Sequence, residues 1–245
     1  MDRPGVDNSL ARYTQFSQRQ EARVDPLFER PFYIAGERID GSIIQHCPGS
    51  EVMVVDFEKD KVLKKFYDEV LRDFSLVQSD IKTTLPEYIQ KRVEGVVVYN
   101  MEISDAFTDG TLQNLVSNPD WMSKLDSRID KETLIKIAKW GLMENVKVDL
   151  GTYIKLRAGV CRQQGVLVAA CMERAIREGK APGWKGVEIR ANMDIALGHL
   201  WAVCLDDKDR EHVFDPAQHY GGGPDGGNWN YKLGYENHVF GKPGT

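Results

Sequence analysis

The sequence has few cysteines, no long apolar run and no excess of basic residues. Its four cysteines show no metal-like spacing, so a zinc site is not expected. It lacks the run of about 18 apolar residues that would predict a transmembrane helix, so we expect no membrane insertion. A net charge of -5 and a pI near 5.6 disfavour a protein that binds nucleic acid by neutralising phosphates.

Several sequence signals of other protein classes are missing as well. The sequence contains no internal repeat and no phosphate-binding glycine loop followed by Lys-Ser or Lys-Thr. Its first residues, MDRPGVDNSLARYTQ, lack the hydrophobic core of a signal peptide. We therefore expect a cytoplasmic protein, or one exported without a cleavable signal. Neither a metal nor an organic cofactor is implied.

The distribution of apolar residues predicts one main domain with two polar ends. Residues 1–30 are charged and show little periodicity, which is typical of a loosely held arm. Residues 31–220 carry the periodic apolar runs and are long enough to bury a substantial core. Residues 221–245 are dense in glycine, asparagine and aromatics, which is typical of a tail or of a loop covering a substrate.

The apolar periodicity predicts helices and strands along the main domain. Helical patterns cover residues 58–77, 84–102 and 130–145. Within the second of these, the run VEGVVVYN at 93–100 is rich in β-branched residues and is also compatible with a strand, although we favour a helix. Two short apolar runs within residues 32–57 predict strands, either beside the main sheet or in a small element that covers the substrate.

A cysteine stands at the start of the most apolar helical pattern, in the stretch RAGVCRQQG. Gly159 interrupts regular structure, and a helix of about four turns is predicted directly after it. Cys161 therefore lies in the first turn. Backbone N–H groups and the positive end of the helix dipole lie there, and both favour a thiolate and can stabilise an oxyanion.

The stretches HLWAVCL and EHVFD predict a β-hairpin around a charged turn at residues 206–210. With the turn centred on Asp207, His199 would lie directly opposite Asp215 on one face of the hairpin. The carboxylate would then orient the imidazole, and the other ring nitrogen would point at Cys161. A slip of one residue would instead turn the two side chains to opposite faces.

The order and spacing of Cys161, His199 and Asp215 resemble the transglutaminase-like superfamily, a papain-like group of cysteine enzymes. The resemblance covers roughly residues 130–220 and is strongest in RAGVC and in FDP. It implies an α+β fold in which the cysteine helix packs on an antiparallel sheet. It also implies that Cys161 is the nucleophile, that His199 is the general base and acid, and that Asp215 orients His199.

Members of this superfamily include transglutaminases, glutamine deamidases, peptidases and bacterial virulence effectors. The resemblance implies a thioester acyl-enzyme formed on a reactive amide of a peptide or protein substrate. Hydrolysis or deamidation is favoured over transfer to an amine, because no second acceptor cleft is indicated. The alternative is a protein-binding module that has kept the fold and lost turnover.

One part of the superfamily pattern has no clear counterpart, the upstream residue that completes the oxyanion hole. Trp140, Tyr153, Gln163 and Gln164 are near enough in sequence to be candidates, after the backbone N–H of Cys161. Trp201 shares a strand face with His199 and would either line the acyl pocket or fill the core.

The remaining cysteines are expected to be structural. Cys171 and Cys204 fall in apolar segments, where a free thiol is usually buried. Cys47 follows His46 before a Pro-Gly turn, which raises the question of a second Cys-His site. Adjacent residues on an extended chain face opposite ways, so such a site is not expected there.

Overall fold

The computed structural model describes residues 29–33, 38–44, 52–78, 83–108, 110–139, 147–192 and 199–223. Its helices are α2 (Lys61–Val77), α3 (Leu85–Val96), α4 (Met101–Thr108), α5 (Leu112–Val116), α6 (Pro119–Lys124), α7 (Lys131–Ala138), α8 (Gly151–Leu156) and α9 (Cys161–Arg177), with a 3-10 turn η1 (Pro216–Gln218). Its strands are β1 (Glu29–Tyr33), β2 (Ser42–Ile44), β3 (Val52–Val55), β4 (Val98–Tyr99), β5 (Lys147–Asp149), β6 (Ala158–Gly159), β7 (Trp184–Asn192), β8 (His199–Asp206), β9 (Glu211–Asp215) and β10 (Tyr220–Gly222).

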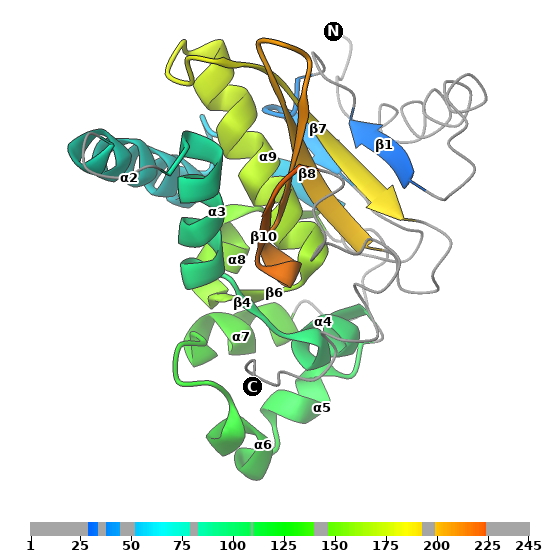
Figure 1. Cartoon of the computed structure of the whole chain (residues 1–245). Helices are drawn as coiled ribbons and strands as arrows, with labels where there is room; N and C mark the ends of the chain where they lie inside the picture. Colours follow the sequence, from blue (N-terminus) through cyan, green and yellow to red (C-terminus); the bar gives the residue numbers. More distant parts are fainter. Residues whose placement is uncertain are drawn as a thin grey trace, which may run out of the picture.

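The described part of the chain has an α+β architecture (Figure 1), as the resemblance of the sequence implies. Its main sheet has the order β1-β7-β8-β9-β10, and every neighbouring pair is antiparallel. A smaller sheet joins β2, β3 and β5, while β4 pairs with β6 in parallel. Helices α4 to α7 gather at the end of the molecule that holds β4 and β6, where α9 begins.

Helix α9 is the central element, because it packs against β7 and β8 on one side and α3 on the other (Figure 1). Helix α9 approaches β8 closely at Gly165. A Cβ atom there would lie 2.7 Å from Leu200 Cδ2 and 3.0 Å from the Leu200 carbonyl oxygen. A residue without a side chain thus lets α9 lie directly on the first residues of β8.

The two faces of β8 pack into different surroundings, as the alternation of strand side chains requires. Leu200, Ala202 and Cys204 are fully buried in the main core. Trp201 and Val203 alternate with them and belong to a separate small cluster of buried residues. Strand β8 is therefore buried on both faces.

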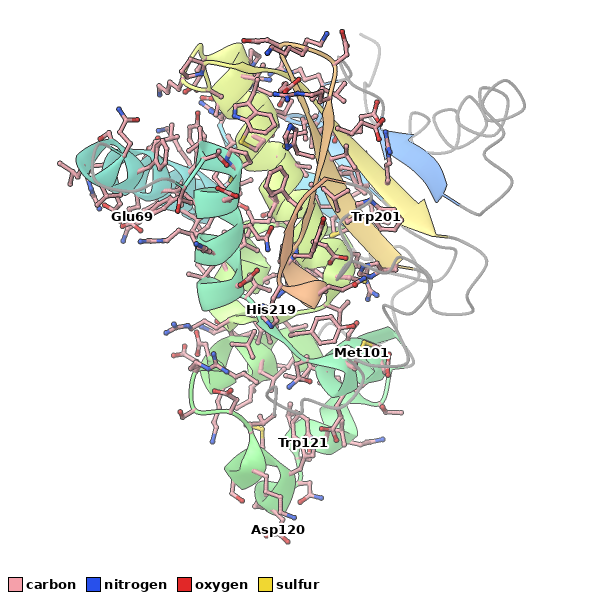
Figure 2. The ribbon with its side chains drawn as sticks, viewed as in Figure 1. Glu69, Met101, Asp120, Trp121, Trp201 and His219 are labelled. Atoms are coloured by element: carbon pink, nitrogen blue, oxygen red, sulfur yellow. The ribbon has the colours of Figure 1, made fainter. Side chains whose placement is uncertain are left out.

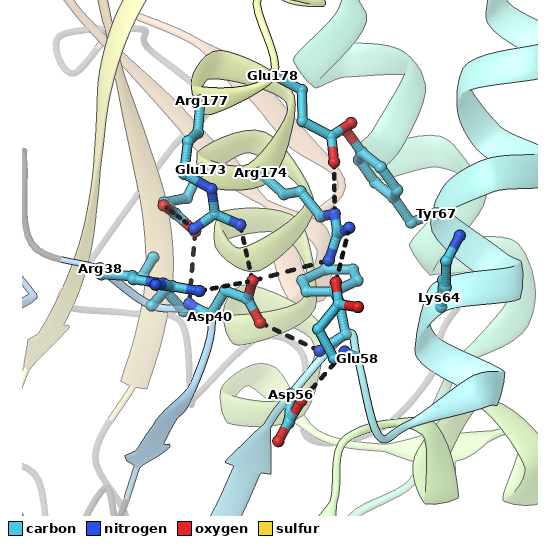
Figure 3. A network of polar contacts seen from close by, with 12 residues as sticks. Arg38, Asp40, Asp56, Glu58, Lys64, Tyr67, Glu173, Arg174, Arg177 and Glu178 are labelled. Carbon is cyan, nitrogen blue, oxygen red and sulfur yellow. Dashed lines mark hydrogen bonds and ion pairs between the residues drawn. The ribbon is translucent and has the colours of Figure 1, made fainter.

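The second half of α9 is tied to the smaller sheet by a network of charges (Figure 3). Asp40, which is 4% exposed, accepts hydrogen bonds from Arg177 Nη2 at 2.7 Å and from the Phe57 backbone N–H at 3.1 Å. The Arg174 guanidinium lies over the rings of Phe57 and Tyr67, 4.8 and 5.5 Å from their centroids. These contacts hold the C-terminal half of α9 against the residues that flank the smaller sheet.

The helix predicted over 84–102 is confirmed as far as Val96, but the prediction is wrong at residues 98–99. Helix α3 ends at Val96, and Val98–Tyr99 form β4 instead. The Val98 N–H donates to the Arg157 carbonyl, and the Asn100 N–H donates to the Gly159 carbonyl. Pairing with a distant strand thus takes these β-branched residues out of the helix.

The other predicted helices and strands form at least in part. The pattern at 58–77 forms α2, and that at 130–145 forms α7 as far as Ala138, beyond which residues 140–146 lie outside the described residues. Of the two apolar runs within 32–57, one contributes to β1 in the main sheet and the other forms β3 in the smaller sheet.

Most of the two predicted polar ends also falls outside the described residues. The described chain begins with β1 at Glu29, and β10 brings the first two residues of the glycine-rich end into the sheet. None of the helices in the described ranges combines the length and apolar character that crossing a bilayer requires.

Candidate active site

Cys161 is the first residue of α9, and only Val160 separates it from β6. The turn before it is fixed by the side chain of Gln163, whose Oε1 accepts a hydrogen bond from the Val160 N–H at 2.8 Å. The cysteine is 5% exposed and forms no disulfide. Its thiol therefore lies at the positive end of a 17-residue helix, in a nearly closed environment.

His199 lies between Cys161 and Asp215. Its Nε2 is 2.6 Å from Asp215 Oδ2, and both side chains are buried, with 2% and 0% of their surface exposed. A second hydrogen bond links the imidazole to the Cys161 thiol. Since Nε2 faces the carboxylate, we infer that the hydrogen bond to the thiol is made by Nδ1. The three residues singled out from the sequence thus form one continuous chain of hydrogen bonds.

The hairpin forms as predicted, but its register differs by two residues. Ala202 pairs with Phe214 and Val203 with Val213, so the same register continued places Asp215 opposite Trp201. The predicted direct pairing of His199 with Asp215 is therefore wrong. A shift of two residues keeps both side chains on the same face, and they meet diagonally across the hairpin.

The charges around Cys161 and His199 favour a thiolate–imidazolium pair. Burial alone would raise the pKa of Cys161, but the His199 charge and hydrogen bond, a backbone hydrogen bond from Leu200 and the charge of Arg162 together lower it. Burial likewise disfavours the imidazolium, yet the charges of Asp215 and Cys161 raise the pKa of His199 to about 10. Each group thus stabilises the charged form of the other.

The other described cysteines have the opposite character. Cys171 and Cys204 are fully buried, as the sequence predicts, and burial raises the pKa of both thiols. Neither is therefore a candidate nucleophile. Cys47 lies outside the described residues.

Trp201 covers the imidazole of His199. The two rings stack at a centroid distance of 5.5 Å and an interplanar angle of 28°, and the tryptophan is fully buried. Figure 2 places Trp201 on the main sheet. Its contact is thus with the histidine ring, and it shields the hydrogen bond between His199 and Asp215 from water.

The remaining oxyanion candidates are not equivalent. Gln164 is 2% exposed, and its Nε2 donates to the Val97 carbonyl at 2.7 Å, so its amide links α9 to the end of α3. The side chain of Gln163 bonds the Val160 N–H. Trp140 lies outside the described residues. Tyr153 is 7% exposed and lines a small cavity that Gly159 and Arg162 also line. The position of Cys161 in the first turn of α9 supplies the backbone N–H groups of that turn as donors.

Gln218 is a site residue that the sequence analysis does not single out. Its backbone N–H donates to Asp215 Oδ1 at 3.3 Å, and its side-chain amide lies 3.3 Å from His199 Nε2. Asp215 is the N-cap of the turn η1, with Pro216 as the first residue. A proline directly after the aspartate is a sequence signal for such a turn, and the turn returns Gln218 to the histidine.

A small cavity lies beside the first turn of α9, with Gly159, Arg162 and Gln163 in its wall. Its volume is about 20 Å³ and its lining is mainly apolar. This is room for about one water molecule, and too little for a substrate side chain. Within the described ranges, no three His, Cys, Asp or Glu side chains are grouped as a metal site would require.

Comparison of the chain with protein-family models, with curated proteins and with solved structures finds no match. The chemistry of the site is therefore inferred from its own residues and geometry.

Proposed function

We propose that the chain is a cysteine-dependent amide-bond enzyme that hydrolyses or deamidates a peptide or protein substrate. The observation that carries this proposal is the buried chain from Cys161 through His199 to Asp215, in which the thiol pKa is lowered. A catalytic cysteine needs a nearby base, an orienting group for that base and a helix N-terminus or comparable positive potential. All three surround Cys161.

The arrangement of elements supports a papain-like, transglutaminase-like core. The cysteine begins a helix that packs on an antiparallel sheet, and neighbouring strands of that sheet carry His199 and Asp215. This is the architecture that the resemblance of the sequence implies. The resemblance rests on order and spacing, and the packing adds a third, independent feature.

In the first half-reaction the Cys161 thiolate attacks the carbonyl carbon of the amide. The C=O electron pair moves onto oxygen, and the N–H groups in the first turn of α9 stabilise the oxyanion. When the C–N bond breaks, the leaving nitrogen takes the proton from Nδ1 of His199. Ammonia or an amine leaves, and the acyl group remains on sulfur as a thioester.

In the second half-reaction a water molecule attacks the thioester. His199 Nδ1, now neutral, accepts a proton from the water, and the tetrahedral intermediate expels the Cys161 thiolate. The product is a carboxylic acid, which corresponds to glutamate where the substrate is a glutamine side chain. An amine in place of water would give transamidation, and exclusion of water from the site would favour it.

The proposal is tested with glutamine-containing peptides, with and without an added primary amine. Ammonia release and conversion of glutamine to glutamate, measured by mass spectrometry, should depend on the protein. Cys161→Ser should reduce the rate to background, while the matched variant Cys171→Ala should retain it. A thioester of Cys161 trapped at low pH would identify the intermediate.

Equal rates for Cys161→Ser and the wild type would contradict the proposal. Absence of turnover on amides of every class, with an ordinary Cys161 thiol, would favour the binding module instead.

A further inference from the structure

The imidazole of His199 has a second polar neighbour at the nitrogen that faces Asp215. The side-chain amide of Gln218 lies 3.3 Å from His199 Nε2, with its nitrogen as the near atom, and the Asp215 carboxylate lies 2.6 Å from the same Nε2. A nitrogen this close to a buried carboxylate must carry the hydrogen that joins them. Nε2–H therefore persists in both the neutral imidazole and the imidazolium.

An N–H group cannot accept a hydrogen bond from the amide NH₂ of Gln218. Rotation of the amide by 180° exchanges its nitrogen and oxygen at almost no steric cost, and places Oε1 next to Nε2–H. We propose that Gln218 presents this oxygen to His199 as a second acceptor, and that it is a positioning residue for the thiolate–imidazolium pair. The proposal rests on the function proposed above.

The turn that carries Gln218 is held in place from three sides. Asp215 Oδ1 accepts the Gln218 backbone N–H, and η1 packs against α9 and α3. The next residue, His219, forms an ion pair with Glu94 of α3 at 3.1 Å, at the end of the sheet that faces the short helices (Figure 2). Gln218 itself is half-buried. Its amide is thus supported by fixed backbone and not by a mobile loop.

Two acceptors on one N–H group restrict rotation of the imidazole ring. With Nε2–H held between Asp215 and Gln218, Nδ1 stays directed at the Cys161 sulfur. An acceptor also stabilises the imidazolium more than the neutral ring, because hydrogen bonds to charged groups are the stronger ones.

The charges that act on His199 are those of Asp215 on β9 and Cys161 at the start of α9. Arg162 of α9 acts on the Cys161 thiol, and Glu94 of α3 pairs with His219 next to Gln218. Gln218 is uncharged, so its contribution can be separated from theirs by substitution.

The test is the titration of His199 by NMR of ring-labelled histidine in the wild type, Gln218→Leu and Gln218→Glu. Leucine has a similar size but no acceptor, so the pKa of His199 should fall by about half to one unit. Glutamate keeps an acceptor in the same place and adds a negative charge, so the pKa should rise. Gln113→Leu, on the exposed face of α5, is the matched control and should leave the titration unchanged.

A merely structural role would change the unfolding transition without moving the titration in opposite directions. A His199 pKa that is the same in all variants, or that shifts the same way with leucine and glutamate, would overturn the proposal. Should Gln218→Leu fail to fold, Gln218→Ala removes the same acceptor and should also lower the pKa of His199. These outcomes are separate from a failure of the proposed function, which would appear as an unreactive Cys161 in the wild type.

Discussion

Substitution of Gly165 tests whether the close packing of α9 on β8 is needed for the lowered pKa of Cys161. In Gly165→Ala the new methyl group would lie 2.7 Å from Leu200 Cδ2, 3.0 Å from the Leu200 carbonyl oxygen and 3.2 Å from Trp201 Cα. The leucine side chain can rotate away, but the two backbone atoms can move only if the strand moves. The helix and β8 must therefore separate by several tenths of an ångström.

The expected cost follows from two opposing effects. Overpacking of a core contact costs about 1–3 kcal/mol, whereas alanine is favoured over glycine in a helix by up to about 1 kcal/mol. With the full gain from alanine, the net destabilisation should be about 0–2 kcal/mol. Gly95→Ala in α3 is the matched control, because a Cβ atom there has no neighbour within 4 Å. That variant should be unchanged or stabilised by about 0.5 kcal/mol.

The separation should also weaken the surroundings of the thiolate. Leu200 donates a backbone hydrogen bond to Cys161, and His199 precedes it in β8. Moving β8 away should therefore raise the pKa of Cys161 and slow its alkylation near neutral pH. Denaturant unfolding and alkylation by a small haloacetamide measure the two effects. Equal stability of Gly165→Ala and Gly95→Ala, with unchanged alkylation, would refute the packing argument.

Two further predictions concern charge. In Asp215→Asn the imidazolium loses its buried counter-charge, so the pKa of His199 should fall from about 10. Amide turnover should fall roughly 10²- to 10⁴-fold. An unchanged NMR titration of His199 would contradict this prediction. Burial opposes ionisation of Glu178, but the charge and hydrogen bond of Lys180 and the hydroxyl of Tyr67 lower its pKa to about 2. The contribution of Glu178 to the stability of the fold should therefore be present above pH 4.5 and lost as the pH falls from 4.5 towards 2. Urea unfolding as a function of pH should show a smaller loss over that range in Glu178→Gln, and parallel curves for the two proteins would count against the assignment.

The sequence predicts the elements of the site better than their contacts. Apolar periodicity locates α9 and the hairpin, because burial imposes a period of 3.6 on the helix and alternation on the strands. It cannot fix the hairpin register, which depends on how the turn at residues 206–210 folds. The predicted contact of His199 with Asp215 is nevertheless present, because a shift by an even number of residues keeps both side chains on the same face.

Other features depend on partners that are distant in the chain. Val98 pairs with β6, some 60 residues away, and no local propensity indicates this pairing over continuation of the helix. The side-chain amide of Gln164 bonds the carbonyl of Val97, so its role is to join two helices. Gln218 reaches His199 through a turn whose shape is set by Asp215 and Pro216. Such contacts follow from the three-dimensional arrangement and are not visible in spacing alone.

The pH dependence of Cys161 alkylation, in the wild type and in His199→Ala, tests the account most directly. Peptide mapping separates Cys161 from the other three cysteines, and unfolding curves confirm that both proteins are folded. In the wild type, alkylation should persist well below the ordinary thiol pKa of about 8.5. In His199→Ala, burial is no longer opposed by the imidazolium, so the titration should move to at least that value. An ordinary titration in the wild type, unaffected by loss of His199, would contradict the catalytic interpretation.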